Sequence, residues 1–173
     1  MAKFDLTNTE RLILANQYKI LSHLENDDSY ARLSDELLEG HEWLYADALG
    51  NVAEVMPTED AEHVITILGI FGDLRDSYDQ LADKSGIDPH DVTFLGFDGN
   101  NESDLRSFAR GLRKADRFAD TLGDEVKNSH MPTTDLYRRM IAKWRELGEP
   151  NYPYSKDTML AIIAARVHPD NRE

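Results

Sequence analysis

The sequence predicts an all-α fold, a multihelical array of about six to seven helices with one irregular, non-helical crossing near residues 92–100. Three observations support this prediction. Apolar side chains recur every three or four residues over most of the 173-residue chain, as in amphipathic helices. Capping residues precede these stretches, and glycine or proline follows them. Residues 92–99 combine bulky apolar side chains with two glycines, a pattern that favours neither a helix nor a solvated loop.

The first two helices are predicted from their ends. Thr7-Asn8-Thr9-Glu10 has the capping-box pattern, in which a threonine and a glutamate three residues later bond each other's backbone N–H groups. A helix from this motif to Leu24 follows. A second helix runs from Ser29 to Glu39 and ends at Gly40, because glycine readily adopts the left-handed conformation that closes a helix. Residues 41–56 allow either a short helix or an irregular packing segment.

Four further helices are predicted in the rest of the chain. Pro57 opens a long one to Ala82, with acidic residues in the first turn, where the helix dipole favours them. The other three run from Asn101 to Leu122, from Pro132 to Leu147 and from Ser155 to Arg166. No linker is long enough to separate domains. Residues 1–168 are therefore expected to form a single helical domain, with residues 169–173 as a frayed tail.

The stretch Val92–Gly99 breaks the helical pattern. Phe94 and Phe97, with Leu95 between them, are expected to pack into the core and to hold a non-helical crossing there. The two glycines of the stretch supply its bends, because glycine tolerates backbone conformations that other residues do not. The polar residues that follow are expected to form a turn and to cap the next helix.

Composition and charge exclude several classes of protein. The net charge is −14, and residues 1–90 hold 19 acidic and 6 basic side chains against 14 and 13 in residues 91–173. The acidic half repels a phosphate backbone, which disfavours nucleic-acid binding. The chain has no cysteine, so disulfides, thiolate metal ligands and cysteine nucleophiles are excluded. Without a membrane-spanning apolar run or a signal-peptide core, a soluble cytoplasmic protein is expected.

Two acidic motifs resemble metal sites but are incomplete. Asp60-Ala61-Glu62-His63, with Glu59 beside it, has the acid–x–x–His spacing of di-iron helical bundles, which need two copies and further glutamates. Residues 98–104 alternate oxygen ligands like a calcium loop but lack its glycine and its final glutamate. An acidic first helical turn and a turn followed by a helix cap explain these residues better. No metal and no other cofactor is predicted.

Basic side chains recur at three- and four-residue spacing on the helix predicted after residue 101, namely Arg106, Arg110, Arg113, Lys114 and Arg117. A second group, Arg138, Arg139, Lys143 and Arg145, lies on the next long helix. Such a face can bind an anion, a phosphate group or nucleic acid. A solvated face, or one paired with acidic residues, is the simpler explanation, and the charge of the whole chain supports it.

Asn16 and Gln17 are amides in an otherwise apolar helix, next to Tyr18. A buried amide without a partner costs about 1–3 kcal/mol, so these side chains need hydrogen-bond partners. One interpretation is a bond to irregular backbone, for which the crossing near residues 92–100 is the candidate. The other is a small-molecule pocket, since pockets combine apolar walls with a few polar groups. Both interpretations require that the two segments lie close together. The pocket would be lined by Asn16, Gln17, Tyr18, Phe94, Phe97 and Asp98.

Several separated motifs together resemble the YfbU family of bacterial proteins over about residues 5–165. These motifs are Thr7–Lys19, Val92–Asp98, Tyr137–Met140 with Trp144, Tyr154-Ser155 and Ile162-Ile163. Residues 40–60 depart most from the family pattern. The resemblance implies an all-helical, oligomeric protein. The family has no established biochemical activity, so the resemblance brings no catalytic residues with it.

The chain contains no nucleophile elbow, phosphate-binding loop or dinucleotide-binding motif, and no catalytic residue is predicted. The sequence therefore favours a non-enzymatic interaction or regulatory protein that acts as a homo-oligomer, a dimer or larger, and that can also bind a protein partner. One alternative is a small-molecule-binding protein or enzyme with its pocket near Asn16, Gln17, Tyr18 and Phe94–Asp98. The other is nucleic-acid association through the Arg106–Arg117 face.

Overall fold

A computed structural model describes residues 5–50 and 53–168 of the chain. The described residues form eight α-helices and no β-strand, which confirms the predicted all-α fold. None of these helices combines the length and the hydrophobicity that crossing a bilayer requires. The helices are α1 (Asn8–Glu25), α2 (Asp28–Glu39), α3 (Glu42–Leu49), α4 (Thr58–Gln80), α5 (Ser103–Lys114), α6 (Ala119–Leu122), α7 (Thr134–Glu146) and α8 (Lys156–Ala164), with a 3-10 turn, η1 (Pro89–Val92), between α4 and α5.

The chain divides into two compact units, Met1–Val55 and Met56–Glu173, where the sequence predicts one domain over residues 1–168. The predicted frayed tail, residues 169–173, lies outside the described residues. The helices α1 to α3 belong to the N-terminal unit and α4 to α8 to the C-terminal unit.

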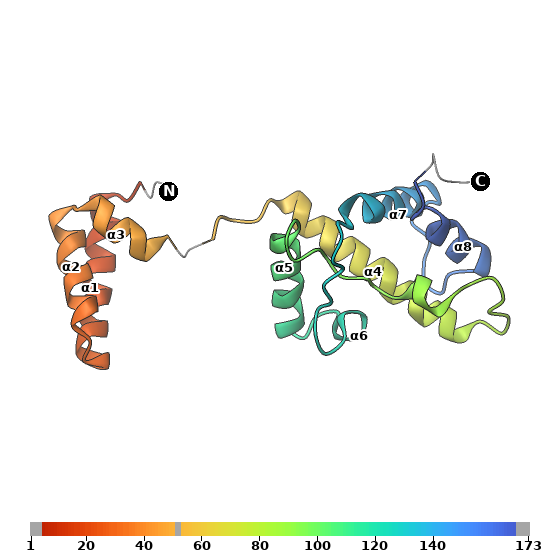
Figure 1. Cartoon of the computed structure of the whole chain (residues 1–173), viewed down its shortest axis with the longest axis horizontal. Coiled ribbons are helices and arrows are strands. Elements are labelled where there is room, and N and C mark those ends of the chain that lie inside the picture. The colour runs from red at the N-terminus through yellow and green to blue at the C-terminus, as the bar shows by residue number, and fades with distance from the viewer. Residues whose placement is uncertain (1–4, 51–52, 169–173) are drawn as a thin grey trace. The chain divides into compact units, whose positions relative to one another are not determined.

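In the N-terminal unit, α1 and α2 form an antiparallel helical hairpin (Figure 1). The predicted capping box is present, since the Thr7 backbone N–H donates to the Glu10 carboxylate at 2.8 Å and the Glu10 N–H donates to the Thr7 hydroxyl at 3.2 Å. Tyr18 stacks on Tyr30 of α2, with ring centroids 6.0 Å apart. The buried apolar core of this unit is small and consists of Ala15, Leu37, Tyr45 and Leu49.

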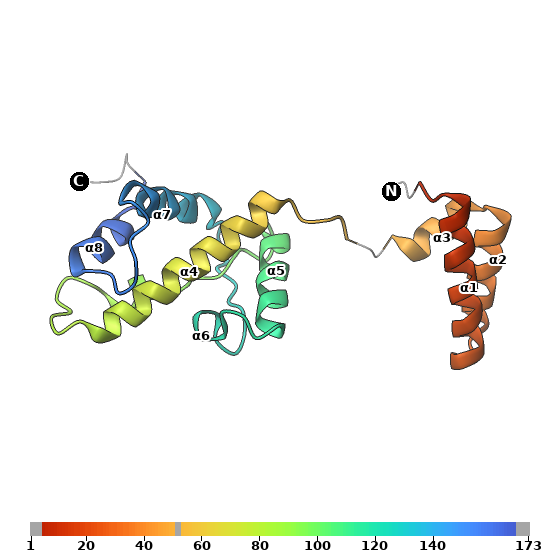
Figure 2. The same cartoon turned by 180° about the vertical axis from the view of Figure 1, so that it is seen from behind.

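In the C-terminal unit, α4 is the central helix (Figures 1 and 2). It contacts α5, α6 and α7, and α8 in turn contacts α7. The large apolar side chains of α4 are buried at helical spacing, and each contributes roughly 1.5–3 kcal/mol through its removal from water. They are Val64, Ile67, Leu68, Ile70, Phe71 and Leu74.

A hydrogen-bonded chain links α7 and the start of α8 to α4. The Trp144 indole N–H donates to the Tyr154 hydroxyl at 3.0 Å, and that hydroxyl donates to the Asp73 carboxylate at 3.0 Å. The Tyr154 backbone N–H also donates to the Ser77 hydroxyl at 2.8 Å. Ser155 then caps α8 through the Thr158 N–H, as its sequence position predicts.

Val92 ends η1, and residues 93–99 form the predicted non-helical crossing. Thr93 directly after η1 is extended, and Phe97 pairs with Asn128 in an isolated parallel bridge. Phe94 and Phe97 are buried, and their rings pack against Phe71 and Tyr137 with centroid separations of 5.5 to 5.7 Å. Such ring pairs add roughly 0.5–1.5 kcal/mol each beyond the area they bury.

The Glu102 side chain caps the N-terminus of α7, although Glu102 precedes α5 in the chain. Thr133, which precedes α7, makes no capping bond with its own side chain. Instead, the Glu102 carboxylate accepts the backbone N–H groups of Thr133 and Thr134 at 2.8 and 2.7 Å, and the Thr134 hydroxyl at 2.6 Å. It also accepts the Asp98 N–H at 2.9 Å. One buried carboxylate therefore joins the crossing, α5 and α7.

Two helix predictions need correction. The helix expected from Asn101 to Leu122 is two helices, α5 and α6, because Asp116 and Phe118 adopt left-handed backbone conformations that interrupt it. Glu102, not Asn101, directly precedes α5. Within the ambiguous residues 41–56, a short helix, α3, is present. These changes account for eight helices in the described residues where about six to seven were expected.

Candidate functional site

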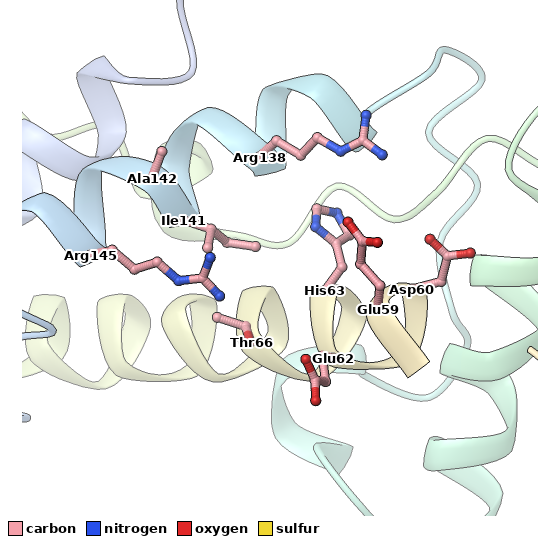
Figure 3. A pocket seen from close by; sticks show the side chains of 9 residues that line it. All are labelled: Glu59, Asp60, Glu62, His63, Thr66, Arg138, Ile141, Ala142 and Arg145. Carbon is pink, nitrogen blue, oxygen red and sulfur yellow. The ribbon is translucent and has the colours of Figure 1, made fainter. Parts of the chain in front are cut away.

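A cavity of about 390 Å³ lies between the first turns of α4 and helix α7 (Figure 3). Glu59, His63 and Thr66 of α4, and Arg138, Ile141 and Arg145 of α7, recur at three- or four-residue spacing, as residues on one face of a helix do. We call this site the α4–α7 cavity. It is lined by Glu59, Asp60, Glu62, His63 and Thr66 of α4, and by Arg138, Ile141, Ala142 and Arg145 of α7.

Side chains of opposite charge face the α4–α7 cavity from its two walls. The α4 wall carries the carboxylates of Glu59 and Asp60, whereas Glu62 points away from α7 (Figure 3), and the α7 wall carries Arg138 and Arg145. Arg138 pairs at 3.2 Å with Asp135 of its own helix. Among the described residues, no ion pair within 4.0 Å joins the α4 carboxylates to these arginines, and the Arg145 side chain has no hydrogen-bond or ion-pair partner. The opposite charges are therefore available to a ligand.

His63 lies between the two charged walls, with Glu59 beside its ring (Figure 3). Its Nε2 atom is buried and has no hydrogen-bond partner within the described structure. Burial lowers the pKa of His63, and Arg138 lowers it further, against the opposing effect of Asp60, Glu102 and Glu59. A neutral imidazole has one nitrogen that donates and one that accepts. His63 therefore adds a partly buried, neutral imidazole to the α4 wall of the cavity.

The sequence presents the two walls separately, as an incomplete acid–x–x–His motif and as a second basic group. Neither pattern predicts that the two groups face each other. His63 and Arg138 are far apart in sequence, and only the packing of α7 on α4 brings them to one cavity. The acidic group of α4 and the basic group of α7 face each other because of tertiary packing, which residue spacing in the sequence does not reveal.

The predicted polar site around Asn16 lies in two different units. Asn16 and Gln17 are exposed on α1, and Tyr18 lines a cavity of about 460 Å³ with residues of α2 and α3. Phe94, Phe97 and Asp98 belong to the C-terminal unit. The predicted proximity of these two segments stays a prediction.

Within the C-terminal unit, Asp98 shapes the turn after the crossing. Its carboxylate accepts the Asn101 side-chain amide and, at 3.1 Å, the Asn100 backbone N–H. These bonds, that from the Asn101 side chain first, lower the pKa of Asp98. Phe94 and Phe97 are enclosed by the aromatic cluster. These contacts account for Asp98 as a turn residue and for the two phenylalanines as core residues.

The predicted basic face is divided between internal contacts and solvent. Arg113 donates to the Gly123 carbonyl at 2.8 Å, and Arg106 donates to the Val126 carbonyl at 3.3 Å. Arg106 is partly buried and lines a cavity of about 410 Å³ between α5 and residues 125–130. The three exposed members are Arg110, Lys114 and Arg117. Part of this face therefore serves to hold the segment after α6, and anion binding by the remainder stays a prediction.

Comparison with known proteins supports the sequence resemblance. The YfbU domain matches residues 4–165 of the chain. The chain is also similar to the UPF0304 protein MJECS11 of Methanocaldococcus jannaschii, with 34% identity over 167 residues. The alignment covers 92% of this chain and 99% of that protein. The resemblance expected over about residues 5–165 is confirmed, and neither name states a biochemical activity.

Proposed function

We propose that this chain, which belongs to the YfbU family, is a non-enzymatic interaction protein that assembles with further copies of itself through its N-terminal unit. One observation carries the proposal. Of the twelve large apolar side chains exposed among the described residues, eight lie in this unit, although it is the smaller of the two. Concentrated exposed apolar surface marks sites of protein–protein contact.

The apolar surface is most continuous on α1. Ile13, Ile20 and Leu24 are each at least half exposed, and with Gln17 they recur at the alternating four- and three-residue spacing of a helix-packing seam. They lie away from the α1 face that holds Ala15, which is buried in the core of the unit. We call these four residues the α1 seam. Because α1 is apolar on two faces and the α1–α2 hairpin covers only one of them, the α1 seam is available to a partner.

A second copy of the chain is the partner that suits this surface. A unit of this size, with four buried apolar residues, gains little stability from its own core, and small folds are commonly completed by oligomerisation. In a two-fold interface each residue can meet its own counterpart. Gln17 suits that position, because its amide both donates and accepts hydrogen bonds. The α1 seam carries no charge that would repel its copy.

Sedimentation equilibrium of the full chain tests the proposal. The wild-type protein is expected at a multiple of 19.7 kDa, and Ile20→Glu is expected to lower that mass by placing a carboxylate in the α1 seam. Leu147→Glu is the matched control, since Leu147 is an exposed leucine of the C-terminal unit. A wild-type monomer at all concentrations, or equal effects of the two substitutions, would contradict the proposal.

A further inference from the structure

We propose that the α4–α7 cavity binds a small zwitterion of amino-acid size, one that carries a carboxylate and an ammonium group. This site lies in the C-terminal unit and goes beyond the self-association proposed above, which concerns the N-terminal unit. The charges of the two walls and the size and apolar lining of the cavity support this ligand.

The charges favour a ligand of both signs. An anion alone would contact the arginines of α7 but would be repelled by Glu59 and Asp60, and a cation alone would meet the reverse problem. A zwitterion satisfies both walls. Its carboxylate matches the planar guanidinium of Arg145, which has no partner among the described residues, because arginine binds carboxylates through two parallel hydrogen bonds. Its ammonium group matches the carboxylates of Glu59 and Asp60.

The α4 carboxylates are suited to remain ionised. Glu59 and Asp60 lie in the first turn of α4, where the positive end of the helix dipole stabilises negative charge. They are held on a long helix whose opposite face is buried in the core. The α4 wall is therefore preorganised, and a ligand that binds it does not have to order a loop.

The size and the remaining lining residues agree with a small polar molecule. A volume of about 390 Å³ falls at the lower end of the range of roughly 300–1,000 Å³ typical of small-molecule sites. Ile141, Ala142 and the methyl group of Thr66 supply apolar contact for the body of a ligand. The His63 side chain lines the same α4 wall, with its Nε2 atom buried behind that wall.

Thermal denaturation of the full chain with each standard amino acid, at millimolar concentration, tests the proposal. At least one amino acid is expected to raise the midpoint of unfolding, because a ligand that binds only the folded state stabilises it. Its N-acetyl derivative, which lacks the ammonium group, and its amide, which lacks the carboxylate, are expected to give smaller shifts. Inorganic phosphate is the anion control. No shift with any amino acid, or an equal shift with phosphate or the acetylated form, overturns the proposal.

Two variants locate the site. Arg145→Gln and Glu59→Gln are each expected to weaken binding of the active amino acid by at least about tenfold, as the loss of a charge-assisted hydrogen bond requires. Arg110→Gln, which removes an exposed cation on α5, is the matched control and is expected to bind normally. Circular dichroism checks that each variant is folded, and ligand-induced shifts of the His63 ring resonances report the position of binding. Unchanged affinity in folded Arg145→Gln protein overturns the proposal.

Discussion

The Tyr137 hydroxyl donates a 2.8 Å hydrogen bond to the carbonyl oxygen of Gly96 and so fastens α7 to the crossing. The same carbonyl accepts the Thr133 hydroxyl at 3.0 Å. Tyr137 is fully buried and contacts Phe71, Phe94 and Phe97. Burial raises the pKa of Tyr137, so its hydroxyl stays protonated and remains a donor.

Tyr137→Phe is expected to lower the free energy of unfolding by about 1 kcal/mol, because it removes one hydrogen bond and keeps the ring. The Gly96 carbonyl retains the Thr133 hydroxyl, whose single proton it shares with the Glu102 carboxylate, and this limits the loss. Urea unfolding followed by circular dichroism measures the change. Tyr152→Phe serves as the control, because it removes a hydroxyl that takes part in an exposed hydrogen bond with the Gln80 side chain. If both substitutions had the same effect, the Tyr137 hydrogen bond would contribute nothing specific.

Gly96→Ala is expected to be far more damaging, at about 3 kcal/mol or more. Gly96 has a φ of +92°, and a Cβ atom added there would lie 2.2 Å from the Lys127 carbonyl oxygen, so backbone would have to move. Gly111→Ala is the matched control in α5, where an added Cβ meets nothing within 4 Å. That change is expected to stabilise the helix by up to about 1 kcal/mol. Equilibrium unfolding compares the two variants. A Gly96→Ala protein as stable as wild type would contradict the close packing of Gly96 against the Lys127 carbonyl.

Glu102→Gln is expected to lower the free energy of unfolding at pH 7 by about 2–3 kcal/mol, because the new amide turns an N–H group toward donors. Burial alone would raise the pKa of Glu102, but hydrogen bonds from Thr134, Asp98 and Thr133 outweigh it and bring the pKa below 4.5. The carboxylate thus stabilises the fold above pH 4.5, and this contribution is lost as the pH falls through the folded-state pKa.

The difference in unfolding free energy between wild type and Glu102→Gln should therefore shrink as the solution is acidified below pH 4.5. Urea titrations at several pH values measure this difference. Asp104→Asn, at an exposed acid of α5, controls for the loss of a charge near the same helix end. A difference that is constant with pH would rule out the proposed role of the ionised carboxylate.

His63 is expected to titrate below its ordinary pKa of 6.5. Burial disfavours the protonated ring most, and Arg138 adds to this effect. Neutral His63 therefore favours the folded state above pH 6.5, and this contribution is lost as the pH falls through the lowered pKa. Arg138→Gln should raise the His63 pKa, while Arg110→Gln should leave it unchanged. NMR titration of the ring protons measures the pKa directly, and a value at or above 6.5 in the wild type would contradict the prediction.

Local features of the fold were predictable from the sequence where one short motif determines the structure. The Thr7–Glu10 capping box, the helix end at Gly40 and the cap at Ser155 are all present. The break between α5 and α6 was not predictable in this way. It depends on left-handed backbone conformations at Asp116 and Phe118. A phenylalanine rarely adopts this conformation, so Phe118 does not predict a helix break.

Contacts between residues far apart in the chain could not be predicted from the sequence. Glu102 reads as part of an acidic turn, yet its carboxylate caps a helix that begins 32 residues later. The α4–α7 cavity joins two patterns that look incomplete when each is considered alone. Both depend on which helix faces pack together, and the spacing of apolar residues specifies that a face is buried without specifying its partner.

The two tryptophans of the chain give each unit its own fluorescent reporter. Trp43 of α3 is 74% exposed, whereas Trp144 of α7 is partly buried and bonded to Tyr154. Indole emission shifts to longer wavelength in water, so the two residues should emit at different maxima in the folded protein. With Trp43 replaced by phenylalanine, the remaining emission follows the C-terminal unit alone, and with Trp144 replaced it follows the N-terminal unit. The melting of each unit can thus be recorded in the intact chain without an attached label.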